Sequence, residues 1–486
     1  MSVVEPSSLE ITQAREIFET CETVKIPPED PLLKFFVFDD KTQTRHSFIA
    51  SSAQVYSRSV VGRSTFGYVA ADLLRHKVVY LKDCWRVNLP DIPKEGSVYR
   101  RLNEAKINHI PTLLCSGDVL KDMEDDDFSL DAEDAEGSQE EGFGDGESYQ
   151  DTRTQDYASA DWYYGAGNMV LPHRHYRLVL DIVGRSLSTF KCTKELCVVL
   201  KDTIEAHRDA YFKADTLHRD VSPGNILITD DGHGLLIDWD LSREVSSHPV
   251  FARRAYRTAT WQFVSAELLS NTNNVPHELH HDLESFAHVF VYSLARYRPT
   301  GLHTVVSTLK SVYDIRAGED ANNAKIIGGD GKVSFFARGT MRPRSFQGHI
   351  NEHCTGLLEE LRQIFQDALY SEDQSPAGKR DRRIARRNLA TSDWLVGRFK
   401  FYLNRRDWPT NDGSIDQIQA FKDNLHSRKR KAHQTFNDDS LGHAKRRMPM
   451  LLSCTRDAFA TGSTVADYDN DANEDSNDEE ETTEDY

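Results

Sequence analysis

The segment from His218 to Asp238 carries acidic and amide side chains in an order that suits phosphoryl transfer. Asp220 and Asn225 lie five residues apart in the sequence HRDVSPGN, and Asp238 follows a strong β-hairpin pattern. Phosphoryl transfer needs a carboxylate that orients the attacking hydroxyl and accepts its proton, and oxygen ligands for Mg²⁺ on the nucleotide phosphates. We therefore predict that Asp220 is the base and that Asn225 and Asp238 bind the metal. A lone aspartate in a loop is more often a turn or cap residue, but the ordered set argues against coincidence.

Two features upstream of this segment could hold a nucleotide. The sequence GRSTFGYV has the spacing of a glycine-rich phosphate loop, with serine replacing its middle glycine, and we assign to the nucleotide site Gly62, Ser64, Gly67 and Val69. Lys82 ends the apolar strand pattern VVYL, where a lysine can hold the α- and β-phosphates. Its acidic partner is expected on the next helix. Glu95 fits because an apolar helical face follows it, and Glu104 is the alternative.

The elements that must position these residues form a strand-rich first part and a helix-rich second part. Residues 55–81 are rich in strand-forming side chains, and residues 176–183 read as a compact apolar strand. A long helix is predicted over about 193–213, and a second apolar helical stripe begins near 282. This arrangement predicts a two-lobed α+β protein.

The end of the 176–183 strand is the predicted adenine contact. A strand followed by Gly184 suits a hinge between the two lobes. We expect the side chain of Leu180 to guard the pocket, and the backbone from Asp181 to Val183 to meet the edge of the base.

Several motifs resemble protein-kinase sequences. HRDVSPGN resembles the catalytic loop H-R-D-x-x-x-x-N, and TATWQFVSAE at 258–267 resembles the end of an activation segment. Asp282, in the sequence HDLES, resembles the buried aspartate that supports this loop, although a helix N-cap is the simpler interpretation. Together these motifs are most similar to the fungal-type protein kinase family of mushroom-forming fungi, over roughly residues 30–400.

The resemblance implies a bilobal protein-kinase-like fold, with ATP and Mg²⁺ as cofactors and a serine or threonine of an unidentified protein as the acceptor. It also gives Arg219, beside Asp220, the role of holding a phosphate on the activation segment through charge-assisted bonds. The expected organisation, in chain order, is an N-terminal extension over 1–50, an N-lobe over 51–183, a C-lobe over 184–400 and a largely disordered tail over 401–486.

Three residues depart from ordinary protein kinases and keep two alternatives open. Ser222 stands where serine/threonine kinases usually carry a lysine, which removes electrostatic stabilisation worth ~3 kcal/mol. Trp239 and Asp240 replace the phenylalanine and glycine of the metal-binding motif. We favour an active enzyme. The alternatives are a small-molecule phosphotransferase of the aminoglycoside or choline kinase type and a pseudokinase scaffold that acts through its acidic segments.

The formal net charge of −18 is concentrated in two segments. Residues 121–156 carry a net charge of −13 and residues 467–486 carry −11, and we predict both to be disordered. Residues 379–447 carry +10 and could associate with those acidic segments or direct nuclear import. Aromatic residues do not interleave the basic ones, so nucleic-acid binding is disfavoured.

The cysteines and the apolar segments indicate an intracellular, soluble protein of the cytoplasm or nucleus. The chain has seven cysteines without a C-x-x-C pair, which favours a reducing compartment. The N-terminus lacks a secretory pattern, and no stretch approaches 18 uncharged apolar residues, so we expect no membrane association.

Overall fold

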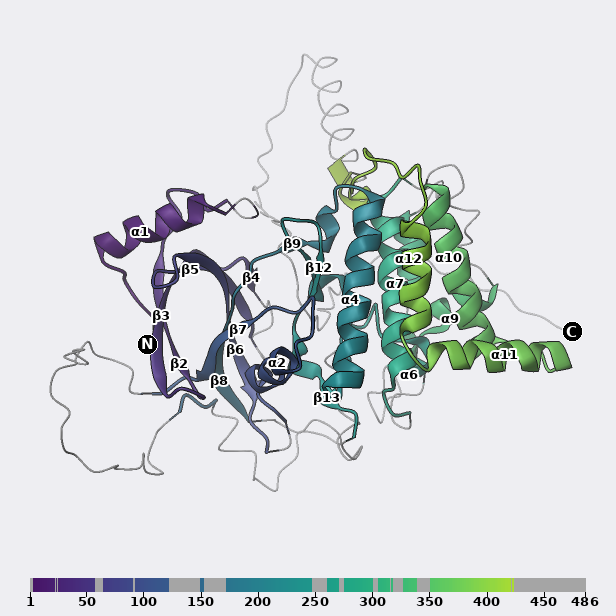
Figure 1. The fold of residues 1–486 in the computed structure, drawn as a ribbon, viewed down its shortest axis with the longest axis horizontal. Coiled ribbons are helices and arrows are strands. Elements are labelled where there is room, and N and C mark those ends of the chain that lie inside the picture. The colour runs from purple at the N-terminus through teal and green to yellow at the C-terminus, as the bar shows by residue number, and fades with distance from the viewer. Residues whose placement is uncertain are drawn as a thin grey trace, which may run out of the picture.

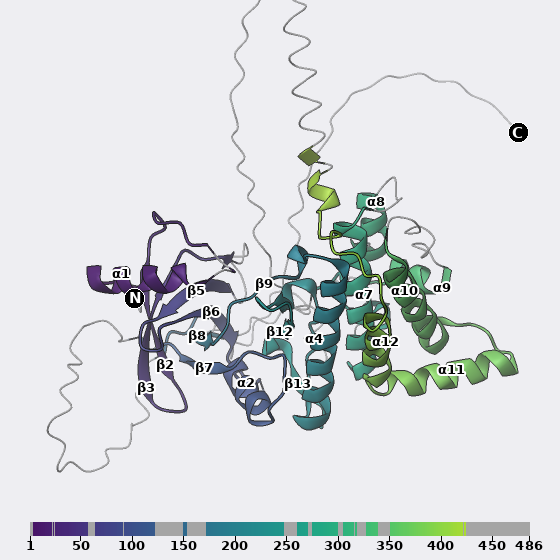
Figure 2. The ribbon, with the colours of Figure 1, turned by 45° about the horizontal axis from the view of Figure 1, so that its top comes forward.

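The structure, a computed structural model, consists of two lobes that meet along the segments containing the predicted site (Figure 1). The first lobe is built around a sheet and the second around parallel and antiparallel helices, as the turned view also shows (Figure 2). The bilobal α+β architecture predicted from the sequence is confirmed. The structure describes residues 3–21, 23, 25–56, 64–90, 92–121, 149–152, 172–246, 260–270, 275–299, 305–314, 316–317, 327–338, 350–420 and 422–423.

An antiparallel sheet forms the first lobe. Its strand order is β1-β2-β3-β5-β6-β8-β7, and β4 pairs with β5 beside β3. The strands are β1 (Val3–Val4), β2 (Leu33–Asp39), β3 (Thr44–Ala50), β4 (Val55–Tyr56), β5 (Phe66–Asp72), β6 (Lys77–Val87), β7 (Leu113–Asp118) and β8 (His173–Leu180). Two helices accompany them, α1 (Ser8–Glu19) and α2 (Glu95–Glu104).

Alternation along these strands gives the sheet two different apolar faces. The Asp40 amide donates to the Ser116 carbonyl at 2.9 Å, so the end of β2 reaches β7 and the sheet curls around one face. That enclosed face is apolar and includes Phe35, Val37, Phe48, Val79, Leu81 and Val179. The other face packs partly on α1 and partly, through Leu178 and Leu180, on α2 and the second lobe.

Helices dominate the second lobe. The main ones are α4 (Thr193–Lys213), α6 (Ala266–Ser270), α7 (Leu279–Tyr297), α8 (Val305–Leu309), α9 (Asp330–Arg338), α10 (Glu352–Phe365), α11 (Pro376–Leu389) and α12 (Asp393–Leu403). Most residues of α7 are buried, and they include polar side chains such as His281, Asp282 and Glu284 as well as apolar ones. Within the described residues, no helix is long and apolar enough to span a bilayer.

Short elements connect the lobes and frame the predicted catalytic loop. They comprise the strands β9 (Arg185–Ser186), β10 (Thr216–Leu217), β11 (Ile226–Ile228), β12 (Gly234–Leu236) and β13 (Arg243–Glu244), and the single turns η1 (Leu187–Thr189), η2 (Pro223–Asn225) and η3 (Trp239–Leu241). Strands β11 and β12 pair as the expected hairpin. Further along the chain lie β14 (Arg316–Ala317), β15 (Ile327–Gly328) and the π-helical segments η5 (Lys310–Asp314) and η7 (Gln366–Tyr370).

The structure differs from two of the expected boundaries. The helical lobe continues past residue 400, because Asp412 accepts hydrogen bonds from the amide and hydroxyl of Thr193 and Asp416 pairs with Arg296 at 2.7 Å. The end of the predicted acidic insertion is also ordered, since Asp151 accepts two hydrogen bonds from Arg174. Asp412, Asp416 and Asp151 are therefore held by specific hydrogen bonds and ion pairs, although the composition of their segments predicted disorder. The rest of the insertion and the acidic tail lie outside the described residues.

Candidate active site

A buried lysine lies between two carboxylates at the junction of the lobes. Lys82, near the middle of β6, places its Nζ 2.7 Å from Glu95 Oε2 and 2.8 Å from Asp238 Oδ1. Glu95 opens α2, and only 3% of its surface is exposed. The alternative partner, Glu104, lies at the exposed end of the same helix, 3.7 Å from Lys41. The structure therefore brings together Lys82, Glu95 and Asp238, as the sequence order predicts.

The charges in this group are unbalanced. Burial alone would lower the pKa of Lys82, but the Asp238 and Glu95 carboxylates raise it well above its usual value. Burial, together with the nearby carboxylates of Asp238 and Asp240, raises the pKa of Glu95 to about 7, although Lys82 opposes this shift. Three carboxylates around one ammonium group form an environment that an additional cation stabilises.

The catalytic-loop residues converge beside this group. Asn225 Nδ2 donates to the Asp220 carbonyl at 2.8 Å and to Asp220 Oδ2 at 3.2 Å, which fixes both side chains. Asn225 is fully buried, and its Oδ1 accepts no hydrogen bond from any described residue. A buried amide oxygen without a donor is costly unless a ligand uses it. Arg219 and Asp238 both have left-handed backbone, with φ of 73° and 63°, an uncommon conformation that recurs at functional sites.

A buried network beneath the loop holds this conformation. Asp282 accepts hydrogen bonds from the Arg219 amide at 2.9 Å, from His207 at 2.8 Å and from His277 at 2.6 Å. Burial would raise the pKa of Asp282, but its histidine neighbours hold it well below the usual value. Asp282 is the supporting aspartate of the loop, and the N-cap of α7 is instead Glu278.

Two histidines near the loop stay neutral because they are buried. Burial lowers the pKa of both His218 and His277 to about 4, against the attraction of Asp282. His218 Nε2 lies 3.0 Å from the Ile237 carbonyl, and its ring meets Trp239 edge-on at 4.5 Å. Trp239 is fully buried and therefore fills the position after Asp238 as an apolar anchor.

Aromatic hydroxyls connect α2 to the site, a feature that the sequence did not reveal. Tyr176 Oη on β8 accepts from the Gly96 amide at 3.0 Å, and Tyr99 Oη accepts from the Asp238 amide at 3.2 Å. A Cβ on Gly96 would lie 2.0 Å from Ser116 Oγ and 2.5 Å from Tyr176 Oη. Glycine at 96 therefore lets the start of α2, and with it Glu95, approach the sheet closely.

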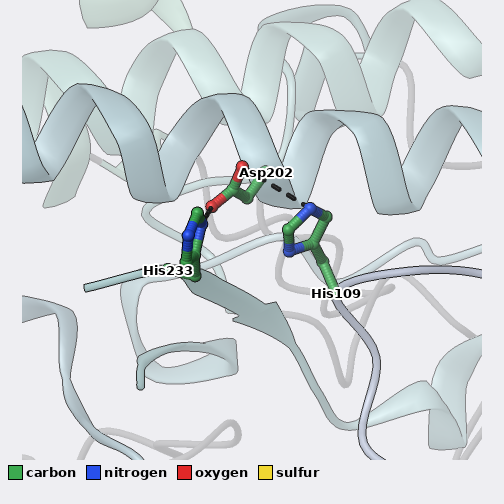
Figure 3. A group of neighbouring side chains, drawn as sticks. All are labelled: His109, Asp202 and His233. Carbon is green, nitrogen blue, oxygen red and sulfur yellow. Dashed lines mark hydrogen bonds and ion pairs between the residues drawn. The ribbon is translucent and has the colours of Figure 1, made fainter. Parts of the chain in front are cut away.

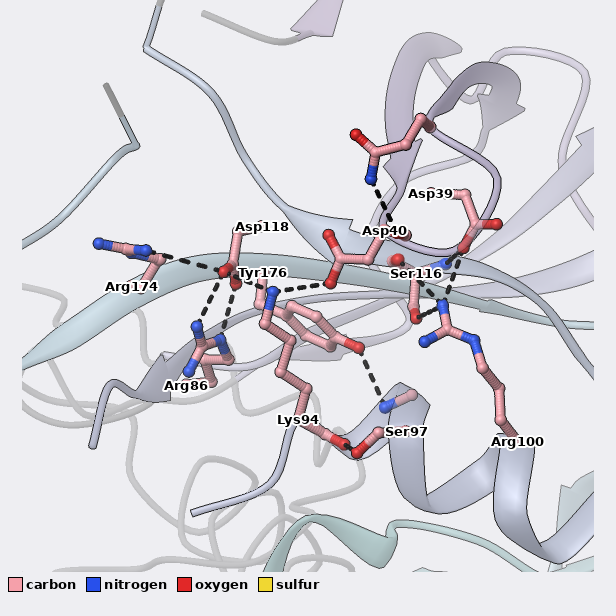
Figure 4. Close-up of polar contacts among 12 residues, drawn as sticks. Asp39, Asp40, Arg86, Lys94, Ser97, Arg100, Ser116, Asp118, Arg174 and Tyr176 are labelled. Atoms are coloured by element: carbon pink, nitrogen blue, oxygen red, sulfur yellow. Dashed lines mark hydrogen bonds and ion pairs between the residues drawn. The ribbon is translucent and has the colours of Figure 1, made fainter. Parts of the chain in front are cut away.

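Ion pairs also hold the same helix against the sheet (Figure 4). Lys94 Nζ lies 2.7 Å from Asp40 and 2.8 Å from Asp118, while Arg100 donates to Asp39 at 2.9 Å. Asp118 is almost fully buried, and burial alone would raise its pKa. Arg86 and Lys94 lower the pKa instead and so stabilise the buried carboxylate. Helix α2 is thus fixed to β2 and β7 independently of the Lys82–Glu95 pair.

A tyrosine lies on the face of the sheet that carries the predicted nucleotide contacts Val69 and Leu180. Tyr80 pairs in register with both Val69 on β5 and Leu180 on β8, so its side chain lies on the same face as theirs. Its hydroxyl lies 2.2 Å from where a Cβ on Gly67 would be, which places the ring between the hinge and the phosphate loop. Sequence reasoning missed this residue, although it immediately precedes Leu81 and Lys82 in the strand pattern that located the lysine.

The remaining nucleotide-site predictions have mixed outcomes. The Asp181 amide donates to the Thr112 carbonyl at 3.0 Å, so this amide is not available to a base. The contacts expected from the other backbone groups between Asp181 and Val183 stay a prediction. Ser64 has left-handed backbone with φ of 37°, a conformation that glycine adopts more readily. Gly62 lies outside the described residues.

The described part of the activation-segment motif contacts Asp220, the predicted base. The Thr260 amide donates to Asp220 Oδ1 at 2.9 Å, and the Ala266 amide donates to Glu284 at 2.8 Å. Lys332 on α9 is fully buried and donates to the carbonyls of Trp261 and Val264. Burial lowers the pKa of Lys332 to about 7. Through its two hydrogen bonds, Lys332 supports the segment next to Asp220, and sequence analysis did not single out this lysine.

These features define a bilobal protein-kinase-like fold whose lysine–glutamate pair, catalytic loop and second aspartate meet at one junction. The family model for fungal protein kinases matches residues 24–294, more than half of the chain. The chain therefore belongs to the fungal protein kinase family. No curated protein matches the chain.

Proposed function

We propose that the protein is a Mg-ATP-dependent kinase that phosphorylates serine or threonine residues of proteins. The observation that carries this proposal is the buried, donor-free Oδ1 of Asn225 beside the Lys82, Glu95 and Asp238 group. These groups suit a metal-bound nucleotide better than a purely structural role, because a buried amide oxygen without a donor lies beside several carboxylates.

Each residue has a defined part in the proposed reaction. Asp220 accepts the proton of the acceptor hydroxyl while that oxygen forms a bond to the γ-phosphorus. The bond from the γ-phosphorus to its bridging oxygen breaks, and ADP leaves with the electron pair. Lys82, held by Glu95, positions the α- and β-phosphates, and Asn225 Oδ1 and Asp238 would hold Mg²⁺, which supplies charge neutralisation on the phosphates.

The acceptor class rests on the segment from Thr260 to Ala266. Its attachment to Asp220 and Glu284 supports a platform for a polypeptide beside the base. A small-molecule phosphotransferase is the alternative. Ser222 favours it, because serine/threonine kinases usually carry a lysine at this position.

Transfer from [γ-³²P]ATP tests both points. Wild type and Asp220→Asn are offered a peptide library and a set of small alcohols. We expect wild type to label peptides and the variant to be slower by a factor of about 10²–10⁴. Equal labelling by both proteins would contradict the mechanism, and labelling of small alcohols alone would establish the alternative acceptor class.

A pseudokinase scaffold is the second candidate, and Tyr80 is the observation that favours it. A ring between the hinge and the phosphate loop occupies space that adenine and ribose need. Under this alternative, Mg-ATP gives no thermal shift with wild type, and a shift restricted to Tyr80→Ala identifies Tyr80 as the obstacle. A shift with wild type supports the enzyme.

We also propose that the basic helix α11 attracts the acidic segments of the same chain. Asp381 is the one acidic residue of this helix. The exposed basic residues of α11 are Lys379, Arg380, Arg383, Arg386 and Arg387. Such contacts weaken with salt. Cross-linking between 379–387 and either 121–156 or 467–486 should decrease at high ionic strength and in Arg383→Glu/Arg387→Glu; unchanged cross-linking in both cases would contradict the proposal.

A further inference from the structure

Two histidines and an aspartate converge where a loop of the first lobe meets the second lobe (Figure 3). His109 comes from the loop between α2 and β7, Asp202 from α4 and His233 from the turn between β11 and β12. His233 Nδ1 lies 2.8 Å from Asp202 Oδ2, and His109 Nε2 lies 3.5 Å from Asp202 Oδ1. One potential ligand atom from each residue lies within 4.8 Å of the other two.

The types and the burial of these side chains match a zinc site. Two imidazole nitrogens and one carboxylate oxygen form a common three-residue set for Zn²⁺, with a remaining position for water. Asp202 is fully buried, and its two carboxylate oxygens face the two histidines, Oδ2 toward His233 and Oδ1 toward His109. About half of the His233 side chain is exposed, so an ion can enter from solvent on that side.

The surroundings of Asp202 also suit a ligand. The Gly234 amide donates to Oδ2 at 3.1 Å and thereby orients the carboxylate, as partners outside the ligand set do in metal sites. Lys201 Nζ is a competitor, since it lies 2.5 Å from Oδ1. It also lies 3.3 Å from Glu205, one turn further along α4, so a displaced ammonium group keeps an acidic partner.

We propose that His109, Asp202 and His233 form a Zn²⁺ site that ties the first lobe to the second. The ion would join the loop that follows α2 to the hairpin whose two ends lead to Asn225 and Asp238. The backbone already connects the same segments, because the Leu236 amide donates to the His109 carbonyl at 3.0 Å. Zinc at this position stabilises the arrangement of the lobes without contacting the reacting groups.

Chelator-treated full-length protein provides the test, with ZnCl₂ and CoCl₂ as probes. We expect Zn²⁺ to raise the melting temperature and Co²⁺ to give visible d–d absorption with histidine ligands. His233→Gln and His109→Asn should each weaken Zn²⁺ binding by at least about tenfold. Asparagine is chosen at 109 because that residue has left-handed backbone, with φ of 63°, which asparagine tolerates.

The matched control is His76→Asn. His76 is an exposed loop histidine that also has positive φ, 49°, and belongs to no ligand group among the described residues. This variant should bind Zn²⁺ as wild type does. Absence of a Zn²⁺ effect on wild type would overturn the proposal. So would equal binding by His233→Gln and wild type, which would place the metal elsewhere, for example at Glu267, His280 and His281.

Discussion

The half of the candidate site that faces the phosphates differs from the half that faces adenine. Around Lys82 and Asn225, hydrogen bonds fix Lys82 to Glu95 and Asn225 to Asp220, and the buried Asn225 Oδ1 has no donor among the described residues. On the predicted adenine side, Tyr80 pairs in register with Val69 and Leu180, so its ring shares their face of the sheet. The comparison suggests two separate tests, one of the polar group around Lys82 and one of the aromatic side chain on the predicted adenine side.

Removing the lysine tests the phosphate half and has the largest expected effect. In Lys82→Met, Glu95 and Asp238 lose their shared cation, and phosphotransfer should fall by about 10²–10³-fold. Steady-state kinetics with ATP measures the loss. Lys77→Met is the matched control, because Lys77 begins the same strand in an exposed position and lies 3.9 Å from Asp181. Equal activity of the two variants would exclude Lys82 from the site.

A methyl group on Gly96 should disturb the same half through α2. In Gly96→Ala the new Cβ meets Ser116 and Tyr176, and overpacking of this kind costs about 1–3 kcal/mol. Chemical denaturation measures the change in the free energy of unfolding. Gly397→Ala on α12 is the control: it has open space at the Cβ and should be neutral or stabilising by up to about 1 kcal/mol. A stable Gly96→Ala protein would show that α2 does not depend on this close approach.

Truncating the tyrosine tests the adenine half. If the Tyr80 ring opposes nucleotide binding, Tyr80→Ala should bind a fluorescent ATP analogue more tightly by about tenfold, worth about 1.4 kcal/mol. Tyr68→Ala is the control, because Tyr68 lies on the opposite face of β5, where its ring meets Phe35 at 4.7 Å. Weaker binding by Tyr80→Ala would indicate instead that the ring stacks on the base.

Acid should destabilise the support beneath the catalytic loop. Because the folded-state pKa of His218 and His277 is about 4, below the usual 6.5, the unfolded chain binds more protons between these values. The free energy of unfolding therefore falls as pH decreases from 6.5 to 4, by up to about 1.4 kcal/mol per pH unit for each histidine. His277→Gln can keep a hydrogen bond to Asp282 without titrating, and it should flatten this slope in urea-denaturation curves. An unchanged slope would show that His277 is not the titrating group.

The sequence could predict those site residues that belong to an ordered motif, and it could not predict those that are identified only by their position in the sheet. Asp220, Asn225, Asp238 and Lys82 occur in a fixed order along the chain, so pattern alone could locate residues that the structure brings together. Tyr80 has the same strand pattern as its neighbours, and only the register with Val69 and Leu180 reveals that it lies in the pocket.

Residues that act through tertiary contacts could not be found from the sequence. Lys332 lies in a segment without a distinctive pattern, and its role depends on the carbonyls of Trp261 and Val264, about 70 positions earlier. The extension of the second lobe beyond residue 400 likewise depends on Thr193 meeting Asp412. The two-lobed architecture was predictable because hydrophobic periodicity is local, whereas these contacts join distant segments.

The Mg²⁺ dependence of nucleotide binding tests the central claim most directly. A non-hydrolysable ATP analogue is titrated calorimetrically into wild type and Asn225→Leu, each with and without Mg²⁺; leucine matches asparagine in size but offers no ligand oxygen. We predict that Mg²⁺ tightens binding to wild type by at least about tenfold and has little effect on the variant. Equal affinity of wild type with and without Mg²⁺ would contradict the assignment of Asn225 and Asp238 as the metal ligands of a kinase.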